Sequence, residues 1–180
     1  MTVKWAITKY NVDLTQVYVT GSSSGCMMSN VMAAVYPDLV SAVSCYSGVP
    51  AGCFAGSPGS SPTSANQTCA QGKVVKTGAE WASQVKAMYP TWAGSYPRFQ
   101  TWHGTADNFV NYYSNFAEQT KEWSTLLGVT FTKNVTNSPQ SGYTQMVYGD
   151  GTKFVAYSAA GVGHTVPVHE TVDLAWFGIN

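Results

Sequence analysis

The chain has 180 residues, which suits a single domain over 1–180, and nine Lys and Arg residues balance nine Asp and Glu residues. A neutral chain without a basic run is a poor candidate for nucleic-acid binding, because nucleic-acid-binding proteins neutralise phosphates with Lys and Arg. With 44% hydrophobic and 10% charged residues, the composition excludes a disordered chain and a coiled coil. No apolar run reaches the roughly 18 residues that a membrane span requires.

The predicted elements of the first part of the chain alternate between helix and strand. Residues 3–10 are predicted to form a helix, and Val17–Thr20 is a β-branched and aromatic run that predicts a buried strand. The run Gly21–Gly25 interrupts this strand. After it, apolar residues at spacings of three and four predict a helix that ends at Pro37, and Ala42–Tyr46 predicts a second buried strand.

The rest of the chain continues this alternation after a long Gly-, Pro- and Ser-rich loop at 47–78. Helices are predicted at Ala79–Met88 and His169–Phe177, and a further helix carries Phe116, Thr120, Trp123 and Leu127 on one face. Strands are predicted at Phe99–Trp102, Thr130–Val135, Tyr143–Tyr148 and Lys153–Tyr157. The inner side of this last helix is expected to carry Val168, Val172, Ala175, Trp176 and Ile179. The alternation predicts an α/β fold, with a mostly parallel sheet covered by helices on both faces.

The most informative motif is Gly21-x-Ser23-x-Gly25, which lies between a predicted strand and a predicted helix. This context is typical of a nucleophile elbow, in which a sharp turn projects the serine hydroxyl and the flanking glycines allow close backbone approach. The helix start directs its positive end and the N–H of Ser24 at a developing oxyanion. The alternative is a flexible Gly-Ser linker, but a linker is not expected to join a buried strand directly to an amphipathic helix.

A serine nucleophile needs a base and an acid that orients the base. His164 lies in the Gly-rich segment Gly161–Pro167, between the last predicted strand and the last predicted helix. Asp107 follows the carboxyl end of the strand Phe99–Trp102, the edge at which the sites of open parallel sheets gather. Ser23, Asp107 and His164 therefore have the chain order Ser, Asp, His of an α/β-hydrolase.

The other candidates for base and acid have simpler explanations. His103 is expected to hydrogen-bond locally and shape the acid loop, and His169 opens a helix, where a surface role is expected. Asp150 occupies a hairpin turn, which is a common structural place for Asp. Asp173 lies on the last helix, where solvation or a salt bridge is expected. The three histidines do not have metal-ligand spacing, so no metal site is predicted.

The four cysteines, Cys26, Cys45, Cys53 and Cys69, include no C-x-x-C pair. Cys53 and Cys69 bracket a Gly-, Ser- and Pro-rich loop that a disulfide would close, and the alternative is free thiols, with Cys45 a buried one. The pairing of Cys26 and Cys45 stays open. The sequons at Asn66 and Asn134 are candidate glycosylation sites and weak indications of secretion.

Together these motifs resemble fungal acetylxylan and feruloyl esterases of carbohydrate esterase family one, from one end of the chain to the other. The matching segments are Val17–Gly25, Met27–Met32, Tyr46–Cys53, His103–Asp107, Gly161–Pro167 and Trp176–Ile179. The resemblance implies an α/β-hydrolase fold, secretion, no cofactor, and hydrolysis of ester groups on plant cell-wall xylan. It also implies that Ser23 is the nucleophile, His164 the base and Asp107 the orienting acid.

The front of the chain departs from this family, because the expected signal peptide, the first strands and the loop that supplies the second oxyanion N–H do not precede Ser23. We therefore expect an N-terminally truncated α/β-hydrolase, either a fragment or a short member whose exposed sheet edge is covered in a homo-oligomer. Acetylxylan esterase is the leading interpretation and feruloyl esterase the alternative. An inactive carbohydrate-binding or structural remnant is the alternative from another class. Of the aromatics Trp81, Trp92, Trp102, Tyr112 and Tyr113, we expect Trp102 and Tyr112 to bind substrate, with core packing as the alternative.

Overall fold

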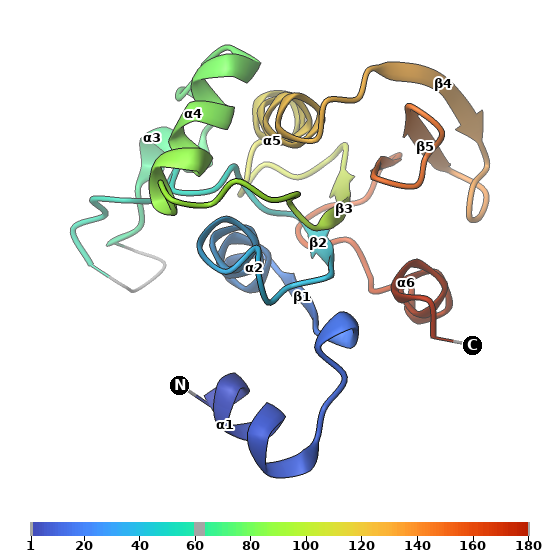
Figure 1. Ribbon diagram of the computed structural model, residues 1–180. Coiled ribbons are helices and arrows are strands. Elements are labelled where there is room, and N and C mark those ends of the chain that lie inside the picture. Colours follow the sequence, from blue (N-terminus) through green and yellow to red (C-terminus); the bar gives the residue numbers. More distant parts are fainter. Residues whose placement is uncertain (1, 60–63, 180) are drawn as a thin grey trace.

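The computed structural model describes residues 2–59 and 64–179, which contain one six-stranded sheet in the order β1-β2-β3-β6-β5-β4 (Figure 1). The strands are β1 Tyr18–Ser22, β2 Ala42–Tyr46, β3 Arg98–Gly104, β4 Phe131–Thr136, β5 Tyr143–Tyr148 and β6 Phe154–Ala159. The pairs β1·β2, β2·β3 and β3·β6 are parallel, whereas β5 pairs antiparallel with both β6 and β4. The expected α/β fold with a mostly parallel sheet is confirmed.

Helices lie on both sides of this sheet. Their bounds are α1 Thr2–Tyr10, α2 Ser24–Val35, α3 Gln67–Ala70, α4 Gly78–Met88, α5 Tyr112–Leu126 and α6 Glu170–Phe177, with a 3-10 helix at Leu14–Gln16. Figure 1 shows α2, α4 and α5 on one side and α6 on the other, while α1 lies apart from the sheet. Among the described helices, none is long and apolar enough to cross a bilayer.

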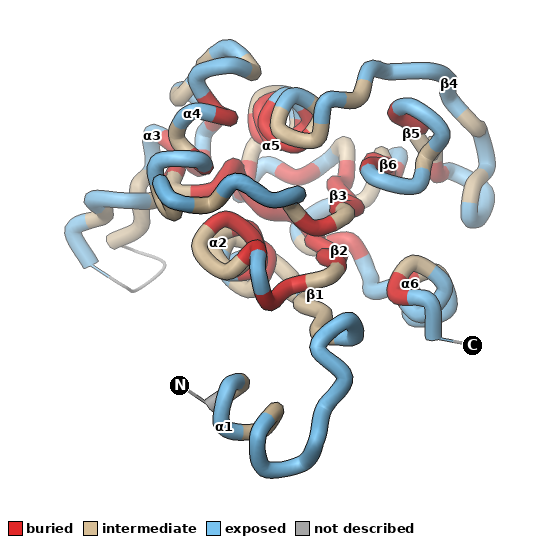
Figure 2. The backbone as a smooth tube through the Cα atoms, viewed as in Figure 1, coloured by how far each residue is buried: buried red, intermediate tan, exposed pale blue. Residues whose placement is uncertain are grey.

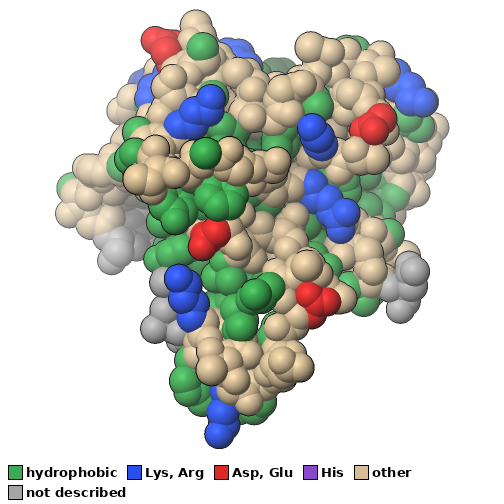
Figure 3. All heavy atoms as spheres, in the orientation of Figure 1, with side chains coloured by type: hydrophobic (Ala, Val, Ile, Leu, Met, Phe, Trp, Pro, Cys, Tyr) green, Lys and Arg blue, Asp and Glu red, His purple; other side chains and the backbone are tan. Residues whose placement is uncertain are grey.

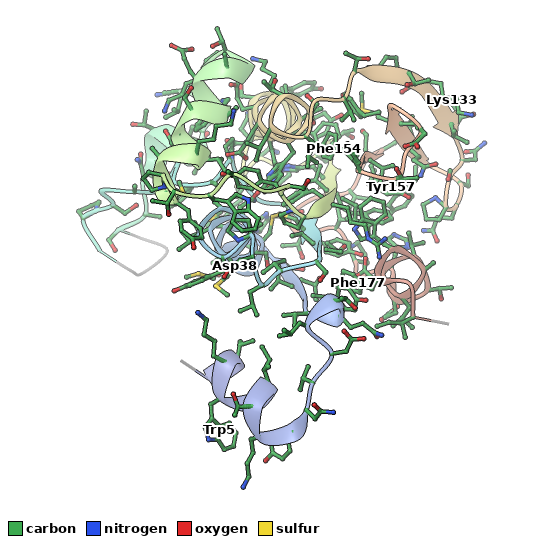
Figure 4. All side chains as sticks on the ribbon, viewed as in Figure 1. Trp5, Asp38, Lys133, Phe154, Tyr157 and Phe177 are labelled. Carbon is green, nitrogen blue, oxygen red and sulfur yellow. A yellow bond between two sulfur atoms is a disulfide. The ribbon has the colours of Figure 1, made fainter. Side chains whose placement is uncertain are left out.

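Alternation along the strands builds two core layers, because successive side chains of a strand point to opposite faces. On β2, Val43 and Cys45 pack in the cluster beneath α2 and α5, whereas Tyr46 packs in the cluster beneath α6. On β6, Phe154 belongs to the first cluster and Tyr157 to the second, and both are labelled in Figure 4. The sheet is therefore buried on both faces at its centre.

The strand β1 is less buried than the sequence predicts. Its five residues are half-buried or exposed, whereas all five residues of β2 are buried (Figure 2). The reason is position: β1 is the end strand, and within the described residues no strand pairs with its outer edge. The expectation of a buried strand at Val17–Thr20 was therefore wrong in burial, and the strand lies at Tyr18–Ser22.

The inner side of α6 also differs from the prediction. Val168, Ala175 and Ile179 are exposed, contrary to the expectation. The buried residues of the helix are Asp173 and Phe177, and Val172 and Trp176 are partly buried against the core. Phe177 stacks on Tyr18 of β1 at 4.7 Å between ring centroids.

The expected solvation or salt bridge of Asp173 is wrong, because its carboxylate lies beneath the sheet. It accepts hydrogen bonds from Ser44 Oγ (2.6 Å), Tyr46 Oη (2.9 Å) and Gln100 Nε2 (2.7 Å). These neutral donors allow a polar side chain to be buried at this position. Burial raises the pKa of Asp173 above its ordinary value, against the lowering effect of the hydrogen bonds.

All four cysteines are disulfide-bonded. The structure joins Cys53 to Cys69 across the long loop and joins Cys26 of α2 to Cys45 of β2. The alternative of free thiols, with Cys45 a buried one, is therefore wrong. The loop also contains the short helix α3, which the sequence analysis did not predict and which begins where Asn66 Oδ1 accepts a hydrogen bond from Cys69 N–H (3.2 Å).

Candidate active site

Ser23 lies in the sharp turn that joins β1 to α2. Its φ of 54° and ψ of −117° place a non-glycine residue in a strained backbone region, and its N–H donates to Tyr46 O at 2.8 Å. Gly21 makes the turn possible, because a Cβ at this position would lie 2.4 Å from the backbone carbon of Gly25. The turn therefore holds the Ser23 hydroxyl away from the sheet at the N-terminus of α2.

Ser23, His164 and Asp107 form a continuous hydrogen-bonded chain. His164 Nε2 lies 2.8 Å from Ser23 Oγ, and His164 Nδ1 lies 2.8 Å from Asp107 Oδ2. The imidazole is partly accessible, with 19% of its side-chain surface exposed, whereas the Asp107 side chain is fully buried. The carboxyl ends of β1, β3 and β6 bring together these residues, which are far apart in sequence. The sequence-predicted acid, base and nucleophile are thus brought together in the order that acyl transfer requires.

The acid loop after β3 fixes Asp107 in its ionised form. Asp107 Oδ1 accepts hydrogen bonds from the N–H groups of Phe109 (3.0 Å) and Val110 (2.8 Å), and His103 Nε2 lies 3.2 Å from Oδ2. Burial alone would raise the pKa of Asp107, but the hydrogen bonds from His103, His164 and Val110 hold it below its ordinary value. His103 is fully buried beside Asp107 and also contacts Val110 O at 3.0 Å, which agrees with the local role expected for it.

The loop that carries His164 is anchored on both sides. Before His164, Val162 O accepts a hydrogen bond from Ala106 N–H (3.0 Å), and Gly104 permits this approach, since a Cβ there would lie 2.2 Å from Val162 O. After His164, Val166 N–H donates to Ser47 Oγ at 3.0 Å. The acid loop and the histidine loop therefore support each other directly.

Trp102 is a core residue, which corrects the expectation that it binds substrate. Its side chain is fully buried, stacked on Tyr157 at 3.7 Å and close to His169 at 4.8 Å between ring centroids. Tyr112 is half-buried and its hydroxyl is hydrogen-bonded to Ser158 Oγ at 2.8 Å. A contact between Tyr112 and substrate stays a prediction. His169, expected at the surface, is partly buried in this aromatic cluster.

The structure adds Phe109, an aromatic that the sequence analysis did not single out. Its side chain is 58% exposed, and its ring lies 5.2 Å from the imidazole of His164 between centroids, tilted by 44°. The only sequence signal for it is its position two residues after the predicted acid. Phe109 is therefore the exposed aromatic that lies against the candidate base.

A groove of about 580 Å³ starts at Ser24 and follows α2. Most of its lining is apolar, and the residues are Ser24, Met27, Met28, Val31, Val35, Val49, Pro50, Gly52, Phe54, Ala55 and Met88. Figure 3 shows hydrophobic side chains gathered on this side of the molecule, between the main body and α1. A larger cavity of about 830 Å³ lies near Trp92 and Arg98, and none of the three triad residues lines it.

No group of three His, Cys, Asp or Glu side chains in the described segments is arranged to hold a metal ion. The hydrogen bonds that join Ser23, His164 and Asp107 support the chemistry of a serine activated by an imidazole and a carboxylate.

No protein-family model matches the chain. Over 98% of its length, the chain is 52% identical to feruloyl esterase B of Talaromyces funiculosus and 45% identical to acetylxylan esterase A of Aspergillus awamori. It covers 50% and 58% of those two proteins, so the chain spans about half the length of the curated relatives it matches.

Solved structures agree with this relationship. The acetyl xylan esterase from Aspergillus awamori superimposes with a TM-score of 0.88 at 44% identity, covering 98% of this chain and 64% of that chain. A PHB depolymerase at 14% identity shares the fold alone, with a TM-score of 0.53 over 86% of this chain and 41% of that one. The chain is thus a close homologue of fungal feruloyl and acetylxylan esterases, with an α/β-hydrolase-type fold.

Proposed function

We propose that this chain carries the catalytic residues of a serine carboxylester hydrolase that removes acetyl groups from plant cell-wall xylan. The observation that supports the reaction type is the chain of two 2.8 Å hydrogen bonds from Ser23 through His164 to Asp107. The identity to feruloyl and acetylxylan esterases supports the substrate class. Residues 1–180 then act as one domain, without a cofactor.

In the first half of the proposed reaction, Ser23 Oγ attacks the ester carbonyl carbon while its proton passes to His164 Nε2. The Ser24 N–H at the start of α2 stabilises the developing oxyanion. The imidazolium is stabilised by Asp107, which is already ionised. His164 then gives its proton to the leaving sugar oxygen, and the acyl group remains on Ser23.

In the second half, His164 takes a proton from water, and the resulting hydroxide oxygen attacks the acyl carbon. The bond to Ser23 Oγ breaks, Oγ regains its proton from His164, and the free acid leaves. Asp107 keeps its charge in both halves, because the hydrogen bonds that its carboxylate accepts outweigh the effect of burial and hold its pKa low.

A feruloyl substrate is the second candidate, and the apolar groove that starts at Ser24 favours it. Its volume of about 580 Å³ and its Met, Val and Phe lining suit a phenolic acyl group rather than an acetyl group alone. The two candidates are separated by comparing acetate release from acetylated xylan with ferulate release from methyl ferulate.

Secretion belongs to the same proposal. Two disulfides suit an oxidising compartment, and the name of the acetylxylan esterase relatives indicates a polysaccharide substrate. Asn134 is exposed on β4, whereas Asn66 is half-buried with its amide 3.4 Å from Cys53 O, so Asn134 is the better candidate for glycosylation. Association of two copies through the open edge of β1 stays a prediction.

The test of the proposed reaction is the Ser23→Ala variant. It should lose ester hydrolysis by about 10⁴-fold or more, because the nucleophile is absent. Ser124→Ala is the matched control, because it removes a hydroxyl near the C-terminal end of α5 that donates to Lys121 O of the same helix. Hydrolysis of p-nitrophenyl acetate by Ser23→Ala at the parental rate would contradict the proposal.

The alternative of an inactive carbohydrate-binding or structural remnant is tested separately with a fluorophosphonate, which reacts only with an activated serine. Labelling of Ser23 in the folded parent supports the enzyme. A folded parent that is not labelled supports the remnant.

A further inference from the structure

Phe109 is a large apolar side chain that packing does not explain. It is 58% exposed, and its ring lies 5.2 Å from the imidazole of His164 between ring centroids. A solvent-exposed aromatic that lies against a candidate base occupies the place where a reacting group must arrive. It is therefore a candidate for contact with substrate.

The backbone around Phe109 is held firmly, so the ring is displayed from a fixed position. Its own N–H is bonded to Asp107 Oδ1 at 3.0 Å, and the next residue, Val110, is buried, with its carbonyl 3.0 Å from His103 Nε2. Asn111 N–H then donates to Ala70 O at 2.8 Å. The same hydrogen bonds that fix the acid therefore fix the backbone that carries the Phe109 ring beside His164.

The reaction itself decides which part of the substrate comes near this ring. His164 Nε2 must donate a proton to the leaving oxygen, which places that oxygen within about 3.2 Å of the nitrogen. The acyl carbon, in contrast, is bonded to Ser23 Oγ and sits beside the N-terminus of α2. The group attached to the leaving oxygen is thus the part of the ester nearest to His164, and Phe109 touches the same imidazole.

We propose that Phe109 binds the leaving-group sugar of the ester and so makes the enzyme selective for the alcohol side of its substrate. This inference rests on the proposed esterase function and extends it from the acyl group to the alcohol. The flat ring offers apolar area to the C–H face of a pyranose at a small entropic cost, because the loop is already ordered. A small alkyl alcohol does not reach far enough to use this contact.

The test compares two acetyl esters that differ only in the alcohol: an acetylated xylo-oligosaccharide and ethyl acetate. In Phe109→Ala we expect kcat/KM on the sugar ester to fall by about tenfold, the loss of one aromatic contact, mainly through KM. On ethyl acetate we expect a change of less than about twofold, and Phe109→Trp should restore activity on the sugar ester.

Phe131→Ala is the matched control. Phe131 is also an exposed phenylalanine, at 50%, but it lies on the end strand β4 against Tyr148. It should leave both kcat/KM values at the parental level. Thermal unfolding and fluorophosphonate labelling of Ser23 show that each variant is folded with an intact triad.

Two outcomes overturn the assignment. Equal losses on both esters in Phe109→Ala, with a shifted pH profile of kcat/KM, would make Phe109 a positioning residue for His164 rather than a contact for the sugar. No loss on the sugar ester would show that the contact is absent. In both cases, a parent that reacts with the fluorophosphonate and hydrolyses the esters still supports the proposed esterase function. A parent that neither reacts with the fluorophosphonate nor hydrolyses either ester refutes both the esterase function and this assignment.

Discussion

The position that most sharply tests the geometry of the elbow is Gly21. In Gly21→Ala, the new Cβ would lie 2.4 Å from the carbonyl carbon of Gly25 and 2.7 Å from its oxygen, where ordinary contacts start at 3.4 Å. Relieving this overlap needs a displacement of about 1 Å between β1 and the start of α2, since both partners are backbone. Ser23 lies between them, so its 2.8 Å hydrogen bond to His164 is lost or misdirected.

A misplacement of about 1 Å costs on the order of 10²-fold in kcat, and this is the loss we expect for Gly21→Ala. Gly25→Ala gives the contrast within the same motif, because a Cβ there meets nothing within 4 Å. That variant should keep its activity and gain up to about 1 kcal/mol in unfolding free energy, since alanine is the better helix former. The assay is hydrolysis of p-nitrophenyl acetate, with urea unfolding for stability. Parental kcat in Gly21→Ala, or an equal loss in Gly25→Ala, would refute the steric argument.

Two further variants test the buried carboxylates. Glu122 is buried and accepts a hydrogen bond from Ala51 N–H at 2.9 Å, and burial raises its pKa. The stability that Glu122 contributes is therefore complete below its ordinary pKa of 4.5 and is lost as the pH rises through its folded-state pKa. In urea denaturation, the unfolding free energy of the parent should therefore fall relative to that of Glu122→Gln as the pH rises above 4.5, and a constant difference would contradict this assignment. Asp107→Asn should lower kcat by about 10⁴-fold, because an amide favours the wrong tautomer of His164. The lowered pKa of Asp107 stabilises the folded parent above pH 3.8, and this stabilisation is lost as the pH falls through the folded-state pKa. The unfolding free energy of Asp107→Asn should therefore fall less steeply in acid than that of the parent. The same dependence on acidic pH in both proteins would count against this assignment.

The triad could be predicted from the sequence because its signals are local. Each of its three residues follows a recognisable strand, and the carboxyl ends of parallel strands meet at one edge of the sheet. The centre of the sheet was equally predictable, since Ala42–Tyr46 is a largely apolar run and Phe99–Trp102 begins and ends with an aromatic residue, as is typical of a strand.

What the sequence could not provide depends on partners that are distant along the chain. Asp173 is buried because Ser44, Tyr46 and Gln100, which lie 73 to 129 residues away, turn their polar atoms toward it. Helix periodicity cannot show this, so the residue was expected in solvent. Phe109 was missed for the opposite reason: a lone aromatic in a loop follows no period, and its significance comes only from the imidazole beside it.

The position of β1 at the end of the sheet has a consequence for how activity is lost on heating or in denaturant. Within residues 2–59 and 64–179, Ser23 follows an end strand that is paired on one side, whereas Asp107 and His164 follow β3 and β6, which have neighbours on both sides. Strands with fewer buried contacts open at lower free energy than the core does. Detachment of β1 would carry the nucleophile away from an imidazole that stays in place. For this chain, loss of the proposed activity should therefore precede the loss of the aromatic core, because Ser23 directly follows an edge strand of the described sheet.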